Sequence, residues 1–103
     1  MGYKPIITEK AEMQLDRILY YILEKLQNRQ AAEASMEDIE RTYAKLEYMA
    51  EAVQLCGDPF LAGKGYRKIA LEQHNYVLLY QVEGEFVYIN GIFHMLEKYW
   101  EKV

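Results

Sequence analysis

The chain has 103 residues, of which 51% are hydrophobic and 27% charged, and its 16 acidic and 12 basic residues give a net charge of −4. This balance is typical of a folded domain and excludes a disordered chain, so we expect a single domain over residues 1–103. The single cysteine, Cys56, excludes an internal disulfide. With neither a signal segment nor an apolar run of the ~20 residues that span a bilayer, we expect a cytoplasmic rather than a membrane protein.

The acidic balance bears on nucleic-acid binding. Lys and Arg supply most of the non-specific affinity for phosphates, so an acidic chain must gather its cations on one face. The compact basic group of this sequence is Lys64, Arg67 and Lys68. The acidic residues of the first half are interpreted as a solvated helix face. They are Glu33, Glu37, Asp38, Glu40, Glu47 and Glu51.

A short strand and a helix are predicted at the N-terminus. Residues 3–7 are a short strand candidate, and Pro5 places it at a sheet edge because proline cannot donate to a ladder. Thr8 is the expected N-cap of the helix that follows. The helix carries an apolar stripe at spacings of three and four. Its members are Ala11, Leu15, Ile18, Ile22 and Leu26, widened by Leu19 and Leu23.

A second helix is predicted over residues 30–54, after a short turn near Asn28. Its apolar residues keep a four-three spacing, and they are Ala32, Met36, Ile39, Tyr43, Leu46, Ala50 and Val53. Neither helix should be stable alone, because backbone ordering costs about 1–2 kcal/mol per residue. The two helices are therefore expected to form an antiparallel hairpin on a sheet. Gly57 and Pro59 are expected to end the second helix, with residues 60–63 as a crossover.

Three consecutive strands follow, over residues 66–71, 76–82 and 86–93. Asn75 suits a left-handed conformation in the first turn, and Gly84 suits the positive φ of a tight second turn. The middle strand is the most apolar, so we expect it to be the most buried. Residues 95–102 suit a short final helix that sets Tyr99 or Trp100 against the sheet.

The stretches YRKIAL and NYVLLYQVEGEFVYI, then His94 and Tyr99, resemble the C-terminal half of the RelE/ParE superfamily of bacterial toxins. The order of the predicted elements also matches that family over nearly the whole chain. The resemblance implies an α+β fold, β-α-α-β-β-β-α, with an antiparallel sheet packed on a helical hairpin.

The resemblance also implies site residues. RelE-like members cut messenger RNA on the ribosome without a metal, using basic and tyrosine side chains. Arg67, His94 and Tyr99 match family positions and are the candidate catalytic residues if this chain is a nuclease. However, Val77 and Met95 stand where those nucleases commonly carry basic residues, and an apolar side chain cannot stabilise a pentacovalent phosphate.

The ParE-like branch is therefore preferred: a toxin of a type II, plasmid-stabilisation system that binds a target such as DNA gyrase and is neutralised by a cognate antitoxin. The alternatives are a RelE-like ribosome-dependent messenger-RNA endoribonuclease and a non-toxic protein-interaction module that keeps the fold. No cofactor is expected, because Gly63-Lys64-Gly65 lacks the P-loop spacing and His74 has no second ligand at metal spacing. The oligomeric state stays open, and a homo-oligomer is allowed.

Overall fold

The computed structural model describes residues 2–95. Its four-stranded sheet has the order β1-β4-β3-β2. The strands are β1 (Lys4–Ile7), β2 (Arg67–Ala70), β3 (Tyr76–Glu83) and β4 (Phe86–His94). β2, β3 and β4 form the expected antiparallel meander, and β1 pairs with β4 in parallel at the sheet edge. The predictions of three consecutive strands and of an edge position for β1 are confirmed.

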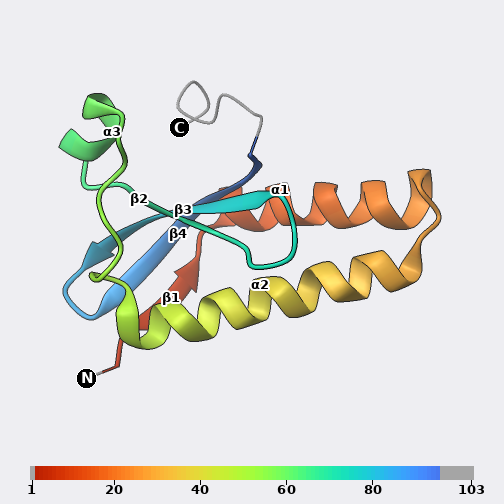
Figure 1. Ribbon diagram of the computed structural model, residues 1–103, viewed down its shortest axis with the longest axis horizontal. Coiled ribbons are helices and arrows are strands. Elements are labelled where there is room, and N and C mark those ends of the chain that lie inside the picture. The colour runs from red at the N-terminus through yellow and green to blue at the C-terminus, as the bar shows by residue number, and fades with distance from the viewer. Residues whose placement is uncertain (1, 96–103) are drawn as a thin grey trace.

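Two antiparallel helices lie beside the sheet (Figure 1). They are α1 (Glu9–Tyr20), continued by a π-helical turn η1 (Tyr21–Lys25), and α2 (Arg29–Met49). The Thr8 hydroxyl accepts a hydrogen bond from the N–H of Ala11, and the Asn28 side chain accepts one from the N–H of Ala31. Both side chains accept hydrogen bonds from backbone N–H groups that have no partner within the first turn of a helix. The predicted hairpin and the predicted cap at Thr8 are therefore confirmed.

The main core lies between the hairpin and one face of the sheet. Ile39 and Leu46 of α2 are almost fully buried in it, and Ile18 and Tyr43 pack against it, as the helical spacing predicts. The sheet contributes Leu78, Tyr80, Val87, Ile89 and Ile92, and Leu71 joins them directly after β2. The prediction that β3 is the most buried strand is not confirmed, because β4 also lies in the sheet interior and buries its residues to the same degree.

A second apolar cluster lies on the other face of the sheet. It joins Val77, Leu79 and Phe93 of the sheet with Cys56 and with Leu61 of a short helix, α3 (Pro59–Gly63). The crossover expected over residues 60–63 thus contains a short helix. The Asp58 carboxylate accepts from the N–H of Leu61 at 3.1 Å, so Asp58 caps this helix and Pro59 begins it.

The end of α2 also differs from the prediction. The helix ends at Met49, five residues before the predicted Gln54, and neither Gly57 nor Pro59 ends it. The Tyr80 hydroxyl donates to the carbonyl of Ala50 at 2.7 Å, and Arg67 donates to the carbonyl of Val53. In a longer helix, these two carbonyl groups would accept hydrogen bonds from backbone N–H groups of the next turn. Here they accept hydrogen bonds from the side chains instead. Contacts from the sheet therefore decide where the helix ends.

The far end of the hairpin projects beyond the sheet as an arm, shown in orange and yellow in Figure 1. The N–H of Leu26 bonds to the carbonyl of Tyr21, five residues earlier, which widens the turn. Leu26 is 56% exposed, and its predicted place in the buried stripe is wrong. Leu23 is also exposed. None of the helices over residues 2–95 is long and apolar enough to cross a membrane.

Candidate functional site

Arg67 lies at the start of β2, and its guanidinium donates to the carbonyl of Val53 just beyond α2. The Arg67 backbone pairs with Tyr80, and an isolated bridge joins it to Leu55. The cation thus binds a carbonyl group four residues beyond the end of α2. In this geometry Arg67 holds the chain after α2 against the sheet. One of its guanidinium nitrogens is already hydrogen-bonded in this contact.

Two tyrosines share the surroundings of Arg67. Burial raises the pKa of Tyr80 to about 12, which the positive charge of Arg67 only partly counters. The Tyr3 hydroxyl donates to Glu51 at 2.7 Å, and this bond to a carboxylate is the main reason why the pKa of Tyr3 is raised. Both phenols therefore stay protonated at neutral pH and act as hydrogen-bond donors, not as bases.

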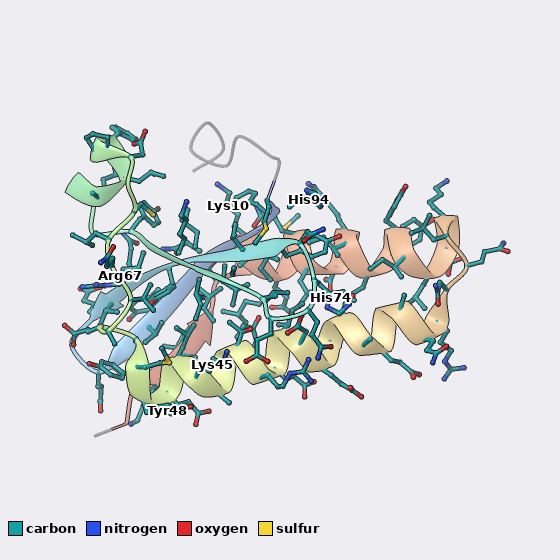
Figure 2. All side chains as sticks on the ribbon, viewed as in Figure 1. Lys10, Lys45, Tyr48, Arg67, His74 and His94 are labelled. Carbon is teal, nitrogen blue, oxygen red and sulfur yellow. The ribbon has the colours of Figure 1, made fainter. Side chains whose placement is uncertain are left out.

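His94, at the end of β4, does not lie near Arg67. Its backbone pairs with Tyr76, and its ring meets that of Tyr76 edge to face with the centroids 5.5 Å apart. Arg67 pairs with Tyr80, four residues further along β3, which is roughly 13 Å at about 3.3 Å per residue. Figure 2 shows Arg67 and His94 at opposite ends of the sheet. The two candidate residues are thus not brought together.

The other positions that bear on a nuclease site are apolar or undescribed. Val77 is 6% exposed and belongs to the second apolar cluster, beside Leu79 and Phe93. Met95 is 43% exposed. Tyr99 and the predicted final helix lie outside the described residues. A cation placed at Val77 would enter an apolar environment, where an unpaired charge is costly.

The three basic residues Lys64, Arg67 and Lys68 do not lie together in the structure. Lys68 is exposed and points to the opposite face from Arg67, because neighbouring strand residues alternate. The Lys64 ammonium lies 4.5 Å from the centre of the Phe60 ring, after α3. The three cations therefore do not converge on one pocket.

A buried carboxylate organises the turn between β2 and β3. Asp38 of α2 is fully buried and accepts from the backbone N–H of Glu72 at 3.2 Å and of Gln73 at 2.9 Å. His74 Nδ1 lies 2.7 Å from the same carboxylate, and an Arg41 nitrogen lies 3.4 Å from it. Burial alone would raise the pKa of Asp38, but the hydrogen bonds from His74, Gln73 and Glu72 outweigh it and lower the pKa.

This contact corrects two interpretations. Asp38 does not belong to a solvated helix face, and Asn75 does not adopt a left-handed conformation, since Gln27 is the one residue other than glycine with positive φ within residues 2–95. The turn is shaped instead by Asp38, and by ion pairs from Glu72 to Arg41 and Lys45. The burial of Asp38 had a signal in the sequence. Ser35, Asp38 and Thr42 follow one another at spacings of three and four, so they lie on one side of α2, and all three are buried.

A groove runs along the arm between its two helices, and we name it the arm groove. Its volume is about 400 Å³. Leu19, Leu23, Ala32 and Met36 form its apolar floor and walls. Three charged residues, Arg29, Glu33 and Glu37, also line it. No group of three His, Cys, Asp or Glu side chains suited to a metal ion occurs within residues 2–95.

Comparison with known families gives one match over most of the chain. The family described as "ParE toxin of type II toxin-antitoxin system, parDE" matches residues 6–99. The chain belongs to the ParE toxin family. It is thus a ParE-type toxin of a type II toxin-antitoxin system, and the superfamily expected from the sequence is confirmed.

Solved structures share the fold of this ParE-type toxin. A chain of the chromosomal ParDE toxin-antitoxin system from P. aeruginosa is 22% identical with a TM-score of 0.73, covering 89% of this chain and 95% of that one. A chain of the RelBE2 toxin-antitoxin complex from Mycobacterium tuberculosis is 16% identical with a TM-score of 0.60, covering 91% and 99%. The comparison with curated proteins found no match. The α+β fold with its helical hairpin is therefore that of the RelE/ParE superfamily.

Proposed function

We propose that this ParE-type toxin acts in the bacterial cytoplasm by binding a cellular target such as DNA gyrase, without cutting RNA, and that a cognate antitoxin neutralises it. The surroundings of Val77 carry the proposal. At this family-matched position, where RelE-like nucleases commonly place an arginine, the side chain belongs to the apolar cluster with Leu79 and Phe93 of the sheet and Leu61 of α3. A cleavage site for RNA needs preorganised cations around the phosphate, and the loss of one such group typically costs about 10²–10³ in rate.

The placement of the remaining candidate residues supports the same proposal. Arg67 binds a carbonyl group next to α2, and His94 lies near the other end of the sheet. A base and a cation that act on one phosphate must both reach it within hydrogen-bond distance. Four strand residues separate these two side chains along β3, which is too far for one phosphate.

The experiment that tests the mode of action expresses the chain without its antitoxin in bacteria. Growth should stop, and incorporation of labelled thymidine should fall before incorporation of labelled leucine. Purified protein should inhibit the supercoiling of plasmid DNA by gyrase in the same concentration range. Growth that continues unchanged would favour a non-toxic interaction module instead.

A second experiment examines RNA cleavage directly. Ribosomes programmed with a defined message are mixed with purified protein, and the 3′ ends are mapped by primer extension. We expect no codon-phased cuts. Cuts that disappear in Arg67→Ala or His94→Ala would overturn the proposal in favour of a ribosome-dependent endoribonuclease.

The antitoxin is expected to cover apolar surface of the toxin by coupled folding, in the way that helices and strands dock on grooves and sheet edges. The similar solved structures come from toxin-antitoxin systems, which supports a partner of this kind. Co-expression with the product of the neighbouring gene should give a stable complex and restore growth. Absence of a complex would contradict neutralisation by that protein.

A further inference from the structure

Aromatic and basic side chains gather where α3 meets β2, at the opposite end of the molecule from the arm (Figure 1). Phe60 of α3 is 60% exposed, although the next residue, Leu61, is fully buried. The Lys64 ammonium lies over the Phe60 ring, 4.5 Å from its centre. Tyr66 packs at the rim of the second apolar cluster, and Lys68 is exposed. We name the surface formed by Phe60, Lys64, Tyr66 and Lys68 the α3 face.

The two lysines of the α3 face lie on the same side of the sheet. The Gln81 amide donates to the carbonyl of Lys64 at 2.7 Å, and Lys68 pairs with Leu79. Gln81 and Leu79 are two residues apart on β3, so their side chains point to the same face. Arg67 points to the other face. The α3 face therefore has two cations beside an exposed aromatic ring.

Hydrogen bonds fix the shape of the α3 face. The N–H of Tyr66 donates to the carbonyl of Leu61 at 3.0 Å, and the N–H of Cys56 donates to the carbonyl of Tyr66 at 2.9 Å. The Asp58 cap and the buried Leu61 side chain hold α3 on the sheet. A surface that is already ordered loses little conformational freedom on binding. Phe60 is thus presented as a preordered anchor, whereas packing within the chain leaves most of its ring unused.

The charges around the α3 face suit an anionic partner. Between residues 54 and 71 the sequence has one acidic residue, Asp58, and three basic ones. The Asp58 carboxylate is occupied by the N–H of Leu61. On a chain with a net charge of −4, this is a local region of positive charge. Opposite charges across an interface attract the partner and fix its register.

The composition of the α3 face favours a protein over a nucleic acid. Affinity for a nucleic acid grows with the number of phosphates that are neutralised, and Lys64 and Lys68 can neutralise few. The net charge of −4 also repels a long polyanion. Aromatic side chains such as Phe60, in contrast, carry much of the binding energy at protein interfaces. An acidic protein segment with an apolar residue therefore fits best.

We propose that the α3 face binds the cellular target of the toxin. The target contributes a protein segment that places carboxylates against Lys64 and Lys68 and an apolar side chain against Phe60. This inference rests on the proposed action by binding a target, and it adds which surface makes the contact and what chemistry the target presents.

The first test measures growth arrest when the chain is expressed without its antitoxin from a graded promoter. Phe60→Ala and Lys64→Glu should each raise the protein level that halves the growth rate by about fivefold or more, because anchors and facing charges are lost. Lys64→Arg, which keeps the charge, should lose less activity than Lys64→Glu. Immunoblots measure the protein levels.

The second test measures binding to purified DNA gyrase by surface plasmon resonance. Phe60→Ala should weaken binding by about tenfold. Lys64→Glu should weaken it about three- to tenfold, and its effect should shrink in about 0.5 M salt, because salt screens an exposed charge. If the unaltered toxin arrests growth without binding gyrase, the target is another protein and the growth assay decides.

Matched controls lie outside the α3 face. Lys25→Glu makes the same charge change at an exposed position of the arm, and Tyr48→Ala removes an aromatic side chain that is 70% exposed on α2. Both should arrest growth and bind as the unaltered toxin does. Thermal melts establish that every variant is folded, which the exposure of Phe60 and Lys64 favours.

The outcomes separate this inference from the function beneath it. Full growth arrest by both Phe60→Ala and Lys64→Glu overturns the inference and leaves toxicity standing. No arrest by the unaltered chain contradicts the proposed function itself. Fluorescence anisotropy with single-stranded and duplex DNA of about 20 nucleotides tests the other class of partner. Binding of either by the unaltered toxin that Lys64→Glu abolishes would assign the α3 face to nucleic acid and overturn the inference.

Discussion

The carboxylate of Asp38 and the imidazole of His74 lie 2.7 Å apart, although 36 residues separate them in the sequence. Asp38 comes from the middle of α2 and is fully buried, and His74 comes from the turn between β2 and β3. The same carboxylate accepts two backbone N–H groups of that turn. The side chain of Asp38 therefore connects α2 of the helical hairpin to the turn between β2 and β3.

Asp38→Ala should lower the free energy of unfolding by about 3 kcal/mol, because it removes a buried acceptor from two backbone donors and from His74. Urea denaturation followed by circular dichroism measures the change. Glu40→Ala, at an exposed position of the same helix, should change stability by less than about 0.5 kcal/mol. Equal effects of the two substitutions would show that the Asp38 contacts do not contribute.

Acid should remove the stability that Asp38 provides. Because the pKa of Asp38 is lowered on folding, the unfolded chain binds the proton more readily. The contribution is thus present above the unfolded pKa near 3.9 and disappears as the pH falls through the lower pKa of the folded state. The stability difference between the unaltered protein and Asp38→Asn should shrink between about pH 5 and pH 3, in urea titrations at each pH. A constant difference would exclude this linkage.

Arg67→Ala should destabilise the chain after α2 more than it destabilises the sheet. Loss of its charged hydrogen bond to the Val53 carbonyl should cost about 1–2 kcal/mol. Hydrogen exchange should become faster for the amides of residues 50–56, since opening there becomes easier. Lys68→Ala, one residue along and exposed on the other face, should leave these amides unchanged. Faster exchange in both variants would argue against a specific role of Arg67.

Ile39→Asp should abolish cooperative thermal unfolding. Ile39 is 2% exposed in the core between hairpin and sheet, and an unpaired carboxylate there is expensive to bury. Ala44→Asp adds the same group at an exposed position of α2 and should melt cooperatively. A melting curve of Ile39→Asp that matches the unaltered protein would mean that this seam is not buried in solution.

Much of the fold was predictable because local patterns specify it. The spacing of Ile18, Ile39 and Leu46 gave the buried faces of the hairpin, and Thr8 marked the start of the first helix. Pro5 gave the edge strand. These features depend on residues close in the sequence, whose periodicity and caps act within a few turns.

The wrong predictions concern places where contacts between residues far apart in the sequence determine the local structure. α2 ends early because Tyr80 and Arg67 bind the carbonyls of Ala50 and Val53. Gly57 and Pro59 predict the end of the second helix, but Pro59 instead begins α3, with Asp58 as its cap. Leu26 is exposed because it lies at the end of the hairpin that projects beyond the sheet.

The candidate site divides in the same way. The sequence by itself determined the superfamily resemblance, the apolar residues Val77 and Met95 at family-matched positions, and the alternation that separates Lys68 from Arg67. The tertiary structure alone decided that Arg67 serves the end of α2, that His94 lies far from it, and that Asp38 is buried with His74. The physical reason is that helix and strand periodicity is local, whereas the partner of a buried charge is chosen by how distant elements pack.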